Sequence, residues 1–222
     1  MPVILALSSL SMLGGCKKET PSPPETSAAA PSRVGQAGGA VALRRETSEL
    51  FDSARAAFLK KDTASAAKAL RDAATLVKAE ADSAARGARV GLSAAASGLE
   101  SVAARIDKNA VKAVKTIDLA FARAHQAEAQ NHLLSAKAAW SANRTSEASS
   151  ELTKAADYFE HAAASAGETL DAASRKTVAD ARELAAQLAK GTAVVPRTFD
   201  ATTKALGSAI STFGSKLARQ KT

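Results

Sequence analysis

Residues 53–70 of the chain read SARAAFLKKDTASAAKAL, and residues 135–152 repeat that pattern as SAKAAWSANRTSEASSEL. The correspondence continues toward the C-terminus without a gap, at a constant separation of 82 residues. Alanine identities prove little in so alanine-rich a chain, so matches between other residue types carry the weight. These pairs include Phe58 with Trp140, Leu70 with Leu152, Lys108 with Lys190, and Asp118 with Asp200. We therefore predict a tandem duplication, with repeat one at about 44–125 and repeat two at about 126–207.

An apolar stripe runs through residues 66–106 with the spacing of a helix. Its twelve positions follow one another in steps of three or four residues, and all are apolar. They are Ala66, Leu70, Ala73, Val77, Ala81, Ala84, Ala88, Leu92, Ala95, Leu99, Val102 and Ile106. Such steps place side chains on one helical face, and their largely eleven-residue recurrence favours a nearly straight packing seam. The stripe therefore predicts a helical core with closely packed helices.

Turn signals divide residues 43–222 into five expected helices. Asp62 and Thr63 supply a turn and a helix cap, Gly191 is a natural helix stop, and Pro196 suits a helix start. The expected helices span residues 43–61, 64–107, 110–143, 146–190 and 198–219. We expect an all-α fold, namely an elongated antiparallel bundle of about five helices built from the 82-residue duplication.

An apolar run ends in Leu13-Gly14-Gly15-Cys16 near the start of the sequence, and it is too short to cross a bilayer as a helix. These four residues resemble the lipobox of bacterial lipoproteins. The resemblance implies a signal peptide at residues 1–15, a diacylglycerol on the Cys16 sulfur, cleavage after Gly15, and membrane attachment without a transmembrane helix. Lys17 stands where lipoproteins of the inner membrane often have aspartate. The resemblance therefore also implies a place on the outer membrane, facing the periplasm.

Residues 16–42 are rich in proline, serine and alanine and contain few large apolar side chains. A segment of this composition cannot bury a core. We expect it to form a disordered tether between the lipidated Cys16 and the helical bundle at 43–222. Lys17 and Lys18 at its start are placed to touch anionic lipid head groups.

His125, Glu128 and His132 lie on the otherwise apolar face of the helix expected at 110–143. Histidine and carboxylate side chains one helical turn apart can bind a divalent metal, and they can equally form a hydrogen-bonded structural cluster. The remaining histidine, His161, is expected on the side of its helix opposite the apolar stripe, so the sequence offers no fourth ligand. Both interpretations stay open at this stage, and no other cofactor is expected.

The formal net charge is +8 and the calculated pI about 9.7. The cations are spread among acidic residues and do not alternate with aromatic ones, which argues against nucleic acid as the partner. We expect contacts with a membrane or another anionic surface through basic residues near the two ends of the chain. These are Lys17, Lys18, Lys204, Lys216, Arg219 and Lys221.

The sequence contains no glycine-rich phosphate loop and no recognisable pairing of a nucleophile with a base, so we do not expect an enzyme. Long duplicated apolar faces favour a structural or adaptor module in the cell envelope that binds another protein or itself. Two alternatives are a carrier or sensor that binds a metal or small ligand inside the bundle, and membrane-surface binding through the C-terminal helix.

Overall fold

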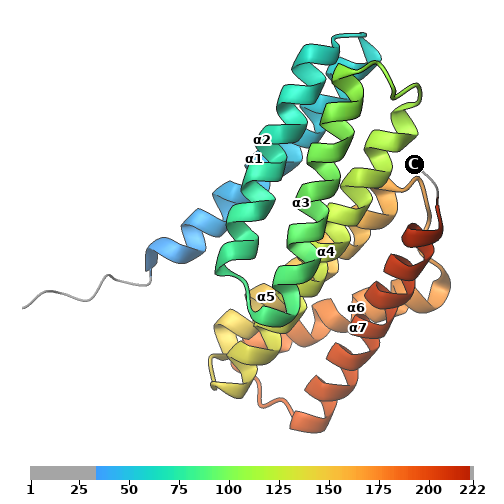
Figure 1. Cartoon of the computed structure of the whole chain (residues 1–222). Helices are drawn as coiled ribbons and strands as arrows, with labels where there is room; N and C mark the ends of the chain where they lie inside the picture. Colours follow the sequence, from blue (N-terminus) through green and yellow to red (C-terminus); the bar gives the residue numbers. More distant parts are fainter. Residues whose placement is uncertain (1–33, 221–222) are drawn as a thin grey trace, which may run out of the picture.

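The computed structural model describes the backbone of residues 34–220 and the side chains of residues 47–220. This part of the chain forms seven α-helices and no β-strand (Figure 1). The helices are α1 (Val34–Leu59), α2 (Thr63–Ser83), α3 (Arg86–Asp107), α4 (Val114–Ser141), α5 (Thr145–Ser165), α6 (Ala172–Ala189) and α7 (Pro196–Arg219). The predicted signal peptide at 1–15 lies outside the described residues, as do Cys16, Lys17, Lys18 and Lys221.

Two apolar cores hold the helices together, and α4 contributes to both of them. The first core joins α1, α2 and α3 to one side of α4, where Ile117 and Phe121 are buried. The second core joins α5, α6 and α7 to the other side of α4, where Leu119 and Leu133 are buried. The fold is therefore an all-helical bundle, as predicted, with α4 running through its middle (Figure 1).

The apolar stripe predicted for residues 66–106 is confirmed, because all twelve of its positions are buried. The chain nevertheless does not form one helix there. Helix α2 ends at Ser83 and α3 begins at Arg86, and between them Ala84 and Ala85 are extended, with ψ angles of 153° and 150°. The buried stripe continues across this turn, because the side chain of Ala84 in the turn is itself buried.

The expected count of five helices is wrong, since each of the two long helices is broken into a hairpin. The break within 64–107 contains neither glycine nor proline. The guanidinium group of Arg89 donates hydrogen bonds to the carbonyls of Ala81 and Ala84, at 3.3 Å and 3.2 Å. The Ala81 carbonyl also accepts the backbone N–H of Ala84, at 3.3 Å. A side chain beyond the turn therefore adds hydrogen bonds to carbonyls at the end of α2 and stabilises the break.

The break within 146–190 has a local signal. Gly167 adopts a left-handed conformation with φ of 69°, which glycine tolerates without a steric penalty. Asp171 then caps α6 by accepting a hydrogen bond of 2.7 Å from the backbone N–H of Ser174. Each of the long helices expected at 64–107 and 146–190 is thus replaced by two shorter helices that form a hairpin.

Helix α1 begins at Val34, earlier than the expected start at residue 43. The segment expected to be a disordered tether, residues 16–42, is therefore helical in its last part. Alanine residues, which favour the helix most strongly, offset the glycines of this stretch. The N-terminal end of α1 projects beyond the rest of the bundle (Figure 1).

Helix ends recur at the spacing of the sequence repeat. Helices α2 and α5 begin and end at positions 82 residues apart. After α1 and α4, Lys61 and Asn143 adopt left-handed conformations, with φ of 64° and 56°. The backbone N–H of each residue donates a 2.9 Å hydrogen bond to the carbonyl three residues earlier, in Phe58 and Trp140. The same turn therefore closes both helices.

The left-handed conformation of Lys61 generates a prediction about stability. A side chain there carries a steric penalty that glycine does not, so Lys61→Gly should stabilise the fold by roughly 0.5–1 kcal/mol. The matched control is Lys60→Gly, which removes the same charge next door, where the backbone N–H still bonds the carbonyl of Ala56. That control should lose roughly 0.5–1 kcal/mol through backbone entropy. Urea unfolding measures both; equal destabilisation by the two substitutions would contradict the turn geometry.

Candidate functional site

Helix α4 carries four polar side chains that are shielded from water, because cores cover it on two sides. His125, Glu128, Asn131 and His132 are exposed by 5%, 1%, 7% and 9%. Buried polar groups in folded proteins are almost always hydrogen-bonded. Partners for these four side chains therefore come from α4 itself and from helices packed against it.

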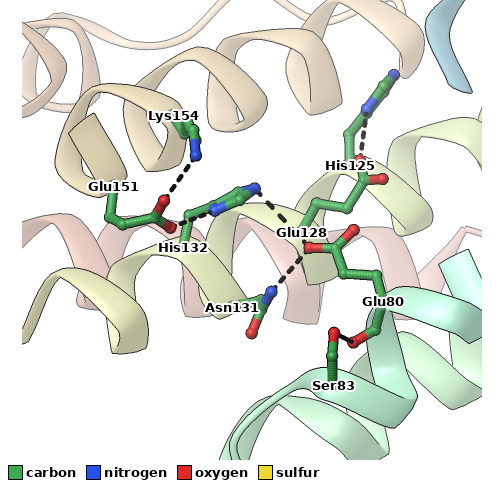
Figure 2. A network of polar contacts seen from close by, with 8 residues as sticks. All are labelled: Glu80, Ser83, His125, Glu128, Asn131, His132, Glu151 and Lys154. Carbon is green, nitrogen blue, oxygen red and sulfur yellow. Dashed lines mark hydrogen bonds and ion pairs between the residues drawn. The ribbon is translucent and has the colours of Figure 1, made fainter. Parts of the chain in front are cut away.

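His125 is paired within α4. Its Nδ1 atom lies 3.1 Å from Oε2 of Glu128, one helical turn away (Figure 2). Burial lowers the pKa of His125 to about 4, although the negative charge of Asp52 opposes this shift. The ring is therefore neutral at neutral pH. An ionised Glu128 can only accept a hydrogen bond, which places the proton on Nδ1 and leaves the lone pair on Nε2.

His132 belongs to a second group of polar side chains that joins three helices. Its Nδ1 atom lies 2.7 Å from Oε2 of Glu151 on α5, and Lys154 donates to Oε1 of the same carboxylate at 2.6 Å. On the other side, Asn131 donates to Oε1 of Glu80 on α2 at 2.7 Å. The Nε2 atom of His132 is 3.8 Å from that oxygen (Figure 2). The group therefore connects α2, α4 and α5.

The pKa values of the two carboxylates in this group, Glu80 and Glu151, are shifted in opposite directions. Burial and the nearby negative charge of Glu128 raise the pKa of Glu80, and the hydrogen bond from Asn131 offsets only part of that rise. Burial also raises the pKa of Glu151, but the hydrogen bonds and charges of His132 and Lys154 outweigh it, so the net shift is downward. Glu151 is therefore the firmly ionised member.

The three residues singled out from the sequence do not converge on one point. His125 and Glu128 form one pair, whereas His132 turns to Glu151. Among the residues with described side chains, no three His, Cys, Asp or Glu residues are grouped as ligands for a metal. Glu80 and Glu151 were missed because they lie on other helices, and only tertiary packing brings them to α4.

The structure places His161 nearer to His125 than the sequence indicated. Its side chain is exposed, as expected for the side away from the stripe, but its ring centroid lies only 5.5 Å from that of His125. The reason is that α5 packs along α4, and residues at the edge of its buried face still reach the neighbouring helix. The ring of Tyr158 lies 5.7 Å from that of His125 and stacks on that of His132 at 5.1 Å.

His125 and His161 both line a cleft of about 710 Å³. The cleft is formed by α1, by the first half of α4 and by the C-terminal end of α5. Phe51 and Phe121 lie at its floor, with ring centroids 4.1 Å apart and nearly parallel planes. At its rim, Nε of Arg55 donates to Oδ1 of Asp118 at 3.0 Å. Asp52, Lys115, Ser48 and residues 164–167 complete the lining.

At the corresponding point 82 residues later, α4 and α7 lie close together, although a smaller cleft of about 360 Å³ opens elsewhere between α3, α4 and α7. At positions 82 residues later, Leu133 replaces Phe51 and Gly207 replaces His125. A Cβ atom added to Gly207 would come within 3.1 Å of the Leu133 side chain, so α4 and α7 approach closely there. Aromatic rings and an imidazole separate α1 from α4, whereas a glycine lets α7 close onto α4. This difference in side-chain size accounts for the cleft.

The basic residues predicted at the C-terminal end have different surroundings. Lys204 and Arg219 are exposed on α7, whereas Lys216 forms an ion pair with Glu168. The apolar side of α7 is buried in the second core through Leu206, Ile210 and Leu217. Within the described part of the chain, no helix combines the length and the hydropathy needed to span a bilayer.

The buried neutral state of His125 generates a prediction about pH. The unfolded chain binds a proton at this histidine near pH 6.5, whereas the folded protein resists protonation until about pH 4. Wild type should therefore lose up to about 3 kcal/mol between these pH values relative to His125→Gln, which keeps a donor for Glu128 but does not titrate. Guanidinium unfolding at pH 7, 5 and 4 in the presence of EDTA measures the difference. Parallel pH profiles would contradict the burial of the ring, because the opposite effect of Glu80 is present in both proteins.

Comparison with known proteins adds no family to these observations. No family model, curated protein or solved structure matches the chain. A function for the chain therefore has to be inferred from its residues and their geometry.

Proposed function

We propose that the chain is a non-enzymatic, lipid-anchored helical module of the cell envelope that binds a protein partner in the cleft between α1, α4 and α5. The lipobox resemblance of Leu13-Gly14-Gly15-Cys16 supports the anchor and a position on the outer membrane facing the periplasm. The bundle supports the binding part of the proposal through one observation, which is the difference between its two matching interfaces.

We propose further that the bundle arose by tandem duplication. The equal bounds of α2 and α5 and the left-handed turns at Lys61 and Asn143 support this origin. Asn109 and Gly191 are a second pair of left-handed residues at the repeat spacing, with φ of 53° and 67°. A duplicated scaffold supplies the same interface twice, so one copy can close for stability while the other stays open for a partner.

The composition of the cleft favours a protein partner. Aromatic side chains form its floor, and charged groups such as Arg55, Asp118 and Lys115 stand around its rim. Protein–protein interfaces have the same arrangement, with an apolar centre enriched in aromatic residues and a polar edge. A cavity of about 710 Å³ accommodates a few inserted side chains of a partner.

Membrane-surface binding through α7 is less well supported than this binding role. The apolar side of α7 is already used by the second core, and Lys216 is engaged by Glu168. Exposed cations such as Lys204 and Arg219 support only peripheral contact with an anionic surface. The buried apolar side of α7 therefore favours a structural role in the bundle.

The cleft generates a prediction about partner binding. Ala164 lies exposed at its edge, so Ala164→Trp should fill the opening and reduce cross-linked partner recovered from native membranes by at least about tenfold. Ala179→Trp, at an exposed position of α6, adds the same bulk elsewhere and should leave recovery unchanged. Affinity purification with mass spectrometry of the cross-linked proteins measures both. A partner retained equally by the two variants would place its binding site outside the cleft.

The anchor generates a separate prediction. Replacing the sulfur in Cys16→Ser removes the atom that the lipid would join, so radiolabelled palmitate should no longer be incorporated. Labelling followed by immunoprecipitation measures this, with Ser22→Ala in the same segment as the control. Unchanged incorporation of palmitate by the Cys16 variant, or no incorporation by wild type, would overturn the anchor.

A further inference from the structure

The cleft brings two histidines from different helices within reach of one ion. His125 comes from α4 and His161 from α5, and their ring centroids are 5.5 Å apart with planes tilted by 37°. We propose that these two histidines bind a transition-metal ion, of the class of Zn²⁺ or Cu²⁺, at the inner end of the cleft. The site requires neither the lipid anchor nor a protein partner, so it stands apart from the proposed function.

The ring separation fits a shared ion. Imidazole nitrogens bind zinc at about 2.0–2.1 Å, so two rings on one tetrahedral ion have their centres roughly 5 Å apart. His161 is exposed, whereas His125 is held by burial. In the proposed site the His161 side chain leaves its present contact and rotates until both rings point at the same ion.

Glu128 prepares His125 for this role. It bonds Nδ1, and the second ring nitrogen lies at the far end of the ring from the carboxylate (Figure 2). Histidines that bind metals commonly donate their other N–H to a carboxylate, which fixes the tautomer and makes the free nitrogen a better ligand. The Glu128–His125 pair has this arrangement on the wall of an accessible cleft.

The remaining coordination positions face the cleft. Asp52 lines the same cavity and is exposed, and its negative charge acts on His125. A turn of this carboxylate would supply an oxygen ligand, and water would fill the other positions. Because no third ligand is already in place among the described residues, the affinity should be lower than that of a closed four-ligand site.

His132 provides the contrast. Its Nδ1 is bonded to Glu151 and its Nε2 faces Glu80, and it does not line the cleft. The sequence pairs His125 with His132, whereas the structure pairs His125 with His161. The two assignments share one histidine and differ in the other, so substitutions separate them.

The test uses the metal-free full-length chain in detergent, titrated with Zn²⁺ and Cu²⁺ by calorimetry. We expect one ion per chain, with affinity lowered at least about tenfold in His161→Ala and several-fold in Asp52→Asn. His132→Gln should bind as wild type does. The electron paramagnetic resonance spectrum of the Cu²⁺ form should show coupling to two imidazole nitrogens, and to one in His161→Ala.

His161 is exposed, so its substitution should leave the fold intact, and circular dichroism of each variant checks this. Absence of binding by wild type would overturn the proposal. Equal binding by wild type and folded His161→Ala would overturn it as well, as would a loss confined to His132→Gln. None of these results bears on partner recovery with Ala164→Trp, which tests the proposed function separately.

Discussion

Enclosure of α4 on two sides is the constraint on which the rest of the structure depends. A helix with protein on both sides has no water to solvate its polar side chains, so each of them needs a partner inside the protein. Asn131 finds Glu80 on α2, and His132 finds Glu151 on α5. The neighbouring hairpins are therefore held in register with α4 by specific polar contacts as well as by apolar packing.

Such a buried group contributes more to specificity than to net stability. Partial burial of Glu80 and Glu151 carries a desolvation cost, which the contacts they make offset. What the contacts supply is a unique arrangement, because any slip of α2 or α5 along α4 would leave a carboxylate unpaired. Apolar side chains as small as alanine, which line most of these helices, would specify that register poorly.

Local patterns predicted the helical class, the buried stripe and the turn and helix cap at Asp62 and Thr63, because each depends on neighbours in the chain. The left-handed conformation of Lys61 beside that turn was not predicted. The turn at Ala84 was not predicted, because the group that stabilises it is the guanidinium of Arg89, which lies beyond the turn. The site was foretold only in part. His125 was identified by its polar character on an apolar face, but the proximity of His161 depends on how α5 packs against α4, which no periodicity reports.

The turn between α2 and α3 has a consequence for the oligomeric state of the protein. Alanine is the strongest helix former, yet Ala84 and Ala85 occupy the place where the chain reverses. Intrinsic preference there opposes the bend, and contacts such as the hydrogen bonds of Arg89 and the burial of Ala84 maintain it. Weakening those contacts should let α2 and α3 straighten into one continuous helix. Two molecules could then exchange their α3 segments and form a domain-swapped dimer, which size-exclusion chromatography would detect.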